Sequence, residues 1–179
     1  MSGIAEMFKD MDTASGSNSG VFFTQGIFGV LLEEVEYRAN GYKGRSVIFK
    51  FKVTDSQDSA HPVGASRVWI LKPFDGTPDQ KKRTMADIKK LVFALLGKTE
   101  KEIGTPEQSP KAHTQATQLF LAACEEEYAT KNNVDPKFLL GRKCALEVQA
   151  VPTGGKDGKA AGTFSRHVWG PATAAVAAA

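Results

Sequence analysis

The chain has 179 residues, of which 41% are hydrophobic and 24% are charged, with a formal net charge of +3. This length and balance are typical of one globular domain and short for two. No run approaches the roughly 18 consecutive apolar residues of a membrane helix, and Met1 to Ser19 lacks the basic start and apolar run of a secretory signal. The two cysteines, Cys124 and Cys144, cannot form a disulfide framework and are typical of a reducing compartment. We therefore expect a cytoplasmic protein without membrane contact.

The two ends of the chain differ in composition from its middle. Residues 12–20 consist only of Asp, Thr, Ala, Ser, Gly and Asn, so we expect residues 1–20 to form a flexible arm outside the domain. Residues 171–179 are mostly alanine without charge, and we expect a disordered tail. The sequence therefore predicts one domain over residues 21–170, with a helical insertion at about residues 84–131.

Alternation of apolar and polar residues predicts five strands. The expected strands are, in chain order, Gly26 to Ala39, Arg45 to Asp55, Ala65 to Lys72, Arg142 to Val151 and Gly162 to Trp169. The second is the clearest, because apolar residues from Val47 to Val53 share one face while Lys50 and Lys52 share the other. In the first strand, strict alternation puts Leu32 and Glu34 on one face and Val35 on the opposite face.

Two helices are expected between the third and fourth strands. The first covers about Met85 to Leu96, because Thr84 with Asp87 resembles a capping box and Gly97 supplies a stop. The second covers Pro110 to Thr130, with proline at the first helical position. Their apolar residues recur at helical spacing, which predicts that one face of each helix is buried.

The order of these elements favours one architecture. Three strands, a helical segment and two further strands are the order of an OB-fold, a small partly open β-barrel. Regular alternation of strands with helices is absent, so a parallel sheet is not expected. We predict a mainly β fold: an OB-fold-like barrel of five antiparallel strands, with helices between the third and fourth strands. A small sandwich with an inserted helical hairpin is the alternative.

The sequence lacks the arrangements that usually carry catalysis or metal binding. The three histidines have no second ligand at metal-binding spacing, and the cysteines form no Cys-x-x-Cys pair. The run Gly154 to Lys159 lacks the spacing of a phosphate-binding loop and leads into a predicted strand. Glu125, Glu126 and Glu127 are consecutive, so they point around a helix and cannot converge as a carboxylate pair. We expect no enzyme, no metal and no cofactor.

Basic residues are concentrated in two distant parts of the chain. Residues 41–72 carry six basic and two acidic side chains, and residues 141–179 carry five and two, whereas residues 1–40 carry two basic and six acidic ones. A sheet can bring the two basic blocks together into a phosphate-binding groove. A solvated surface is the alternative explanation.

The places that an OB-fold uses for nucleic acid contain both cations and rings. Single-strand binders combine a basic groove with aromatic faces on which bases stack, and OB-folds use the second and third strands with the loops after the first and fourth. The predicted DNA-contact residues are Tyr42, Lys43 and Arg45 after the first strand, Lys50 and Lys52 on the second, Arg67, Trp69 and Lys72 on the third, Lys156 and Lys159 after the fourth, and Arg166 on the fifth. Tyr42 and Trp69 are expected to stack bases, and the cations to neutralise phosphates. Cations that only keep the surface soluble and a tryptophan in the core are the alternatives.

Four stretches of the chain share a pattern with a known family. They are Gly20 to Gly26 with the strand that ends in Glu33-Glu34-Val35, Gly44 to Val53, His61 to Trp69, and Ala86 to Gly97 followed by Gly141-Arg142-Lys143 and by Phe164-x-Arg166-x-x-Trp169. In them the chain resembles phage-encoded single-stranded-DNA-binding proteins of small OB-fold type. The resemblance implies cofactor-free binding of single-stranded DNA during phage replication or recombination, in the host cytoplasm, with replication or recombination proteins as further partners. Residues 99–138 lie outside the resemblance.

A protein-binding role is the alternative function. A phage structural or adaptor protein can use the same barrel for protein contacts, because a fold does not determine a function. This alternative predicts no affinity for oligonucleotides and a surface patch that is more apolar than basic. The edge strands of a small barrel also leave a homodimer open.

Overall fold

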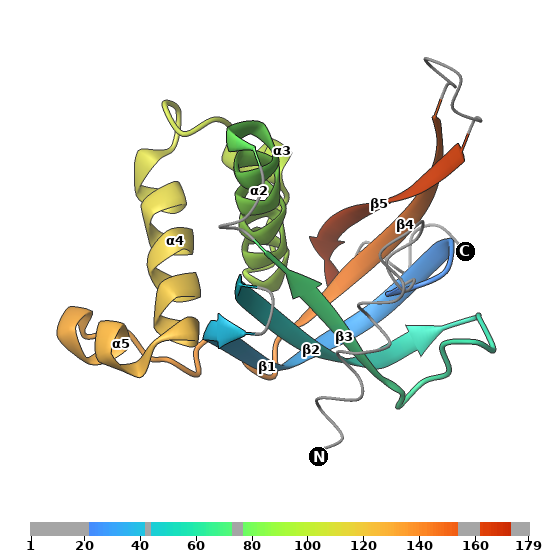
Figure 1. Cartoon of the computed structure of the whole chain (residues 1–179), viewed down its shortest axis with the longest axis horizontal. Helices are drawn as coiled ribbons and strands as arrows, with labels where there is room; N and C mark the ends of the chain where they lie inside the picture. Colours follow the sequence, from blue (N-terminus) through green and yellow to red (C-terminus); the bar gives the residue numbers. More distant parts are fainter. Residues whose placement is uncertain (1–21, 42–43, 73–76, 154–161, 173–179) are drawn as a thin grey trace.

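The computed structural model describes residues 22–41, 44–72, 77–153 and 162–172 (Figure 1). Within these residues, five antiparallel strands form one sheet, and helices lie between the third and fourth strands. The strands are β1 (Gly26–Gly41), β2 (Gly44–Ser56), β3 (Ser66–Leu71), β4 (Lys143–Thr153) and β5 (Gly162–Pro171). The helices are α2 (Pro78–Leu95), α3 (Glu100–Ile103), α4 (Pro110–Cys124) and α5 (Glu126–Asn132).

The strand order of the sheet is β3-β2-β1-β4-β5. The long strand β1 pairs with β2 along its length and with β4 through its first six residues, from Gly26 to Leu31. The mainly β character and the five antiparallel strands of the prediction are therefore confirmed. The sheet is open, with β3 and β5 as its edges, so its hydrogen bonding does not close the predicted barrel.

The two faces of the sheet differ sharply in β2. Val47, Phe49, Phe51 and Val53 are each at most 1% exposed, and they define what we call the inner face. Because successive side chains of a strand point to opposite faces, Lys50 and Lys52 lie on the other, outer face. This part of the alternation pattern predicted the strand and its buried side correctly.

A bulge in β1 changes the faces that the sequence predicted. Leu32 pairs with Phe51 and Glu34 pairs with Lys50, so Glu33 is an extra residue between them. One extra residue shifts the alternation by one, and Val35 therefore returns to the inner face opposite Phe49. The prediction that Leu32 and Glu34 share a face was wrong. The shift places Glu34 of β1 beside Lys50 of β2.

Helix α2 begins seven residues before the predicted start at Met85. Its N-cap is Thr77, whose hydroxyl accepts from the backbone N–H of Gln80 (3.3 Å), while the Gln80 amide oxygen accepts from the N–H of Thr77 (2.8 Å). This is a complete capping box with Pro78 at the first helical position. The cap predicted at Thr84 was wrong, because that hydroxyl donates to the Gln80 carbonyl within the helix.

The second predicted helix is divided in two. Glu125 has extended backbone angles (φ −141°, ψ 113°) and separates α4 from α5. The break places Glu126 and Glu127 in the first turn of α5, where the helix dipole favours negative charge. The short helix α3 was not predicted. None of the helices in the described ranges is both long and apolar enough to cross a membrane.

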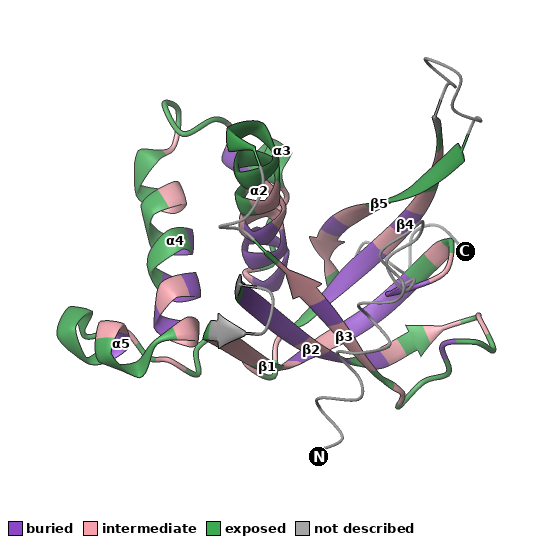
Figure 2. Cartoon of the chain, viewed as in Figure 1, coloured by how far each residue is buried: buried purple, intermediate pink, exposed green. Residues whose placement is uncertain are grey.

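Helices α2 and α4 lie side by side over the inner face of the sheet (Figure 1). Their buried side chains and those of the strands form one core (Figure 2). The ring of Phe120 on α4 stacks on that of Phe49 on β2, with centroids 6.3 Å apart. Among the described residues, α2 and α4 therefore lie on the inner side of the sheet, opposite to Lys50 and Lys52.

Candidate nucleic-acid interface

Lys50 and Lys52 stand on the outer face of β2, as predicted from their alternation with the buried phenylalanines. Lys50 lies opposite Glu34 of β1 and Val68 of β3, and its Nζ is 4.0 Å from a carboxylate oxygen of Glu34. Lys52 is exposed and has no ion pair within the described residues. Both ammonium groups are therefore open to a phosphate.

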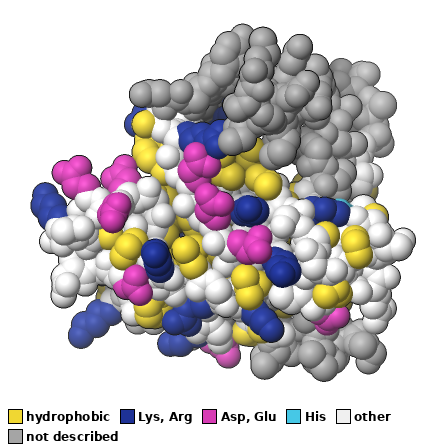
Figure 3. Space-filling view, turned by 90° about the horizontal axis from the view of Figure 1, so that it is seen from below, with side chains coloured by type: hydrophobic (Ala, Val, Ile, Leu, Met, Phe, Trp, Pro, Cys, Tyr) yellow, Lys and Arg dark blue, Asp and Glu magenta, His cyan; other side chains and the backbone are white. Residues whose placement is uncertain are grey.

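Acidic residues of β1 lie along the same face. Glu34 faces Lys50, Glu36 forms an ion pair with Arg38 (Nε to Oε1 2.5 Å), and Glu33 accepts from the hydroxyl of Ser66 on β3 (3.5 Å). Viewed from below the sheet, cations and carboxylates are interspersed with apolar side chains (Figure 3). The face therefore carries charges of both signs, and its attraction for a polyanion depends on a few cations.

Arg67 and Trp69 lie on the inner face, away from Lys50 and Lys52. The register pairs Lys50 with Val68, and Trp69 with Phe49, so the two predicted groups of contact residues point to opposite sides of the sheet. The guanidinium of Arg67 donates to His61 Nδ1 (2.7 Å) and to the carbonyls of Ala60 (2.6 Å) and Ser66 (3.0 Å). The prediction that Lys50 and Lys52 share a surface with Arg67 and Trp69 was therefore wrong. Arg67 instead makes hydrogen bonds within the protein.

The indole of Trp69 is packed in the core. It is 7% exposed, and its ring contacts Phe22 (centroids 6.0 Å apart), Phe49 (5.6 Å) and Trp169 (5.3 Å). Trp169 is also 7% exposed. In this conformation neither ring offers a free face to a base, so Trp69 is not the exposed stacking residue that the sequence predicted.

Arg45 and Lys72 are exposed at one end of the β2–β3 pair. The last pair of the register joins Val47 to Leu71, so Lys72 follows directly beyond that pair, on the side where Arg45 begins β2. Lys72 therefore extends the outer face of Lys50 and Lys52, whereas Arg45, two residues before Val47, alternates onto the inner side of β2. The other predicted contact residues, Tyr42, Lys43, Lys156 and Lys159, lie outside the described residues.

The β4–β5 hairpin extends beyond the rest of the sheet (Figure 1). Pairing of β4 with β1 stops at Val148, whereas pairing of β4 with β5 continues to Thr153 and Gly162. On this two-stranded arm, Phe164 is 50% exposed and Arg166 is exposed. The two side chains are two residues apart and share a face of β5. An exposed ring next to a cation is the combination that single-strand binders use.

The sequence prediction included Arg166 but did not select Phe164 as a stacking residue. The signal available in the sequence was its position, five residues before the buried Trp169 and among the polar residues that follow the glycine-rich loop. Polar neighbours on both sides indicate that a ring lies outside a core. The distance from the core, however, depends on where pairing with β1 stops.

Helix α2 contributes cations next to β5. Burial raises the pKa of Asp87, while the charges of Lys90 and Arg166 lower it, so Arg166 lies close to this side of the helix. Residues three and four apart share a helix face, and Arg83 therefore lies on the side of Asp87, one turn earlier. Lys90 is paired with Glu100 (3.3 Å), and Arg83 is exposed.

A polar cluster fixes the segment before β1 to the β2–β3 connection. The backbone N–H of Thr24 faces His61 Nε2 (3.0 Å), its hydroxyl donates to the Asp58 carboxylate, and Arg67 Nε faces His61 Nδ1. Because a neutral imidazole accepts at only one nitrogen, His61 accepts from either Thr24 or Arg67 at one time, and a protonated His61 accepts from neither. The hydrogen bond from Thr24 lowers the pKa of Asp58. Burial and then the charge of Arg67 lower the pKa of His61, against the raising effect of Asp58.

Stability should fall as the pH drops below about 6.5. Burial also lowers the pKa of His167, so both histidines bind fewer protons in the folded chain than in the unfolded one, where the pKa is near 6.5. The unfolded state is then favoured by acid, and each pH unit between the two pKa values costs about 1.4 kcal/mol per histidine. Urea denaturation at about pH 7.5 and about pH 5.5 measures this. The double variant His61→Gln/His167→Gln should lose most of the difference, and an equally large difference in that variant would contradict the assignment.

The thiols and the described acidic residues form no site of their own. Burial raises the pKa of Cys124 and of Cys144 to about 12, so neither is a thiolate at neutral pH. Within the described ranges, no group of three His, Cys, Asp or Glu side chains is placed to hold a metal ion. The cations of β2, β5 and α2 therefore remain the candidate functional groups.

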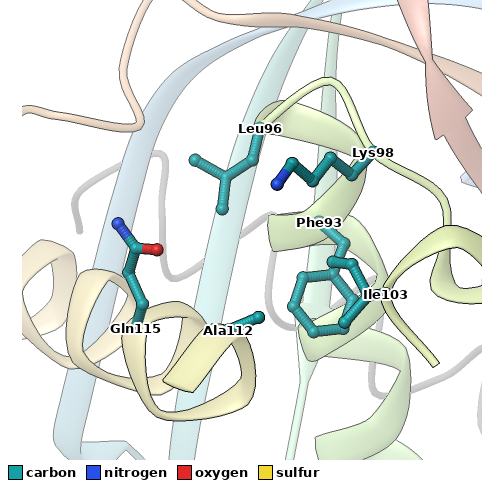
Figure 4. Close-up of a pocket in the computed structure, with 6 residues that line it drawn as sticks. All are labelled: Phe93, Leu96, Lys98, Ile103, Ala112 and Gln115. Atoms are coloured by element: carbon teal, nitrogen blue, oxygen red, sulfur yellow. The ribbon is translucent and has the colours of Figure 1, made fainter. Parts of the chain in front are cut away.

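A small pocket lies between α2, α3 and α4 (Figure 4). It has a volume of about 200 Å³, and its lining is mostly apolar, with Lys98 and Gln115 as polar members. The remaining lining residues are Phe93, Leu96, Ile103 and Ala112. A pocket of this size admits a small apolar group and is too small for a nucleic-acid strand.

No family model matches this chain, and no curated protein matches it significantly.

Proposed function

We propose that this chain binds single-stranded DNA with little sequence preference, in the manner of the phage-encoded proteins it resembles, during DNA replication or recombination. The strand order carries the proposal. The order β3-β2-β1-β4-β5, with helices after β3, is that of an OB barrel opened between its third and fifth strands. In such a fold, β2, β3 and the loops after β1 and β4 bind oligonucleotides.

The OB assignment is supported by contacts across the open edges. Trp69 of β3 contacts His167 (5.6 Å) and Trp169 (5.3 Å) of β5 through its ring. The inner faces of the two edge strands thus approach each other through side chains, although no hydrogen bonds join them. We propose a barrel that is completed by aromatic packing.

The cations supply the attraction for DNA in this proposal. Lys50, Lys52 and Lys72 lie along the outer face of β2 and the end of β3, and Phe164 and Arg166 are exposed on the β4–β5 arm. The phosphates of the strand would lie along the cations of β2, and a base would stack on Phe164. Acidic neighbours on β1 reduce the attraction, so we expect moderate affinity with a clear dependence on salt.

Fluorescence anisotropy tests the proposal. Labelled oligo-dT should bind more tightly than the matching duplex, and an RNA competitor measures the preference for DNA. With about four phosphates neutralised, the slope of log K against log salt should be about −3, since each contact to a single strand contributes about 0.7. Absence of oligonucleotide affinity, or tight binding that salt does not change, would contradict the proposal.

A protein-binding adaptor is the second candidate. The mixed charges on the outer face of β1 and β2 favour it, because interspersed signs suit a protein partner better than a polyanion. It predicts that no oligonucleotide binds in the same titration. The two candidates are therefore separated by a single measurement.

A further inference from the structure

The residues before β1 insert a ring between the two edges of the sheet. Phe22 is 9% exposed and belongs to the irregular segment 22–25, outside any helix or strand. Its ring lies nearly parallel to that of Trp69 on β3 (6.0 Å, 18°) and perpendicular to that of His167 on β5 (5.7 Å, 83°). The Phe22 ring therefore lies stacked beside the indole of Trp69, which the sequence predicted to stack a base.

Trp169, which contacts the Trp69 and His167 neighbours of Phe22, carries an unpaired donor. The indole N–H of Trp169 is buried and has no hydrogen-bond partner, and Trp169 belongs to the same cluster as Trp69 (5.3 Å) and His167 (6.4 Å). Buried donors are almost always paired. A phenyl ring offers no acceptor in its plane, whereas a nucleobase carries carbonyl oxygens and ring nitrogens at its edge.

The segment is held by Phe22, whose ring also contacts Phe23 (4.6 Å) and Phe51 of β2 (5.6 Å), and by the residues just after it. Phe23 is fully buried against Phe28 (4.5 Å) and His61 (4.9 Å), and Thr24 is held by His61 and Asp58. Phe22 is the residue next to this anchor, on its N-terminal side.

We propose that the place held by Phe22 is a nucleobase site, closed in this conformation by the chain's own ring. A base of a bound strand displaces Phe22, stacks on Trp69 and offers an acceptor to the cluster that contains the Trp169 N–H. The inference rests on the proposed function and adds to it an occluded stacking site between β3 and β5. It explains why an indole on the expected strand is covered by a residue from outside the sheet.

The variant Phe22→Ala tests the inference. It should bind labelled oligo-dT about tenfold more tightly than the wild type, because a stacked base no longer competes with the phenyl ring. Deoxyadenosine monophosphate should quench its tryptophan fluorescence, and Phe22→Ala/Trp69→Phe should lose both effects. Phe120→Ala, which removes another buried ring from the helix–sheet contact, is the matched control and should show neither gain.

The outcomes separate this inference from the proposed function. A folded Phe22→Ala chain that binds oligo-dT no more tightly than the wild type overturns it, as does a gain that persists without Trp69. If Phe22→Ala does not fold, the variant Phe22→Leu keeps apolar volume without a planar ring. It should bind oligo-dT a few-fold more tightly than the wild type. Unchanged affinity in Phe22→Leu would also overturn the inference. Quenching by deoxyadenosine monophosphate without affinity for any oligonucleotide would support the site and contradict single-stranded-DNA binding.

Discussion

Reversal of two charges on β2 should weaken single-stranded-DNA binding about 100-fold at low salt. The variant Lys50→Glu/Lys52→Glu removes two cations from the outer face and adds two carboxylates beside Glu34. Phosphates then meet an acidic surface, and the salt slope should decrease in magnitude by about 1.4, because each contact to a single strand contributes about 0.7. Anisotropy titrations of labelled oligo-dT at several salt concentrations measure both quantities.

The fold should tolerate this change. The Lys50 side chain is 44% exposed and its partner Glu34 is 59% exposed, and an exposed pair of this kind contributes little to stability. Lys131→Glu/Lys137→Glu, on α5 and the turn after it, makes the same change in net charge away from the strands. It should bind almost as well as the wild type. Equal loss in the two variants would mean that only net charge matters and would remove the β2 surface from the proposal.

The strands could be predicted because their burial pattern is local. Alternation from Val47 to Val53 determines which side of β2 enters the core, whatever strand lies next to it. The start of α2 was also encoded locally, since Thr77 and Gln80 form a capping box, but Thr84 and Asp87 offered a competing match. The bulge at Glu33 could not be predicted from the alternation of residues in β1, because the extra residue is defined by pairing with β2.

The candidate site depended on register, which the sequence did not contain. Lys50 and Lys52 were assigned to the correct face from β2 alone. Whether Trp69 joins them is decided by the pairing of Lys50 with Val68, and a slip of one residue would move the indole to the outer face. Phe164 depended on a similar non-local fact, the end of pairing between β4 and β1. Local patterns therefore predicted side chains, and tertiary pairing decided which of them meet.

Removal of the exposed ring on the β4–β5 arm should weaken binding of oligo-dT about 30-fold without a loss of stability. Base stacking on an aromatic side chain contributes about 1–3 kcal/mol, and about 2 kcal/mol corresponds to this factor. Phe164→Ala removes a ring that is 50% exposed, so the unfolding midpoint should change little. Anisotropy and urea denaturation of the same preparation test both expectations.

The matched control is Phe138→Ala, which removes a ring that is 38% exposed in the turn before β4. The guanidinium carbon of Arg142 lies 4.2 Å from the centroid of this ring. This variant should bind oligo-dT like the wild type. Residues 149–153 and 162–166 pair only with each other, so a change at Phe164 cannot disturb the pairing of β1 with β4. Loss of affinity in Phe164→Ala alone would therefore report a direct contact with the strand, and unchanged affinity would place the bound strand elsewhere than on the arm.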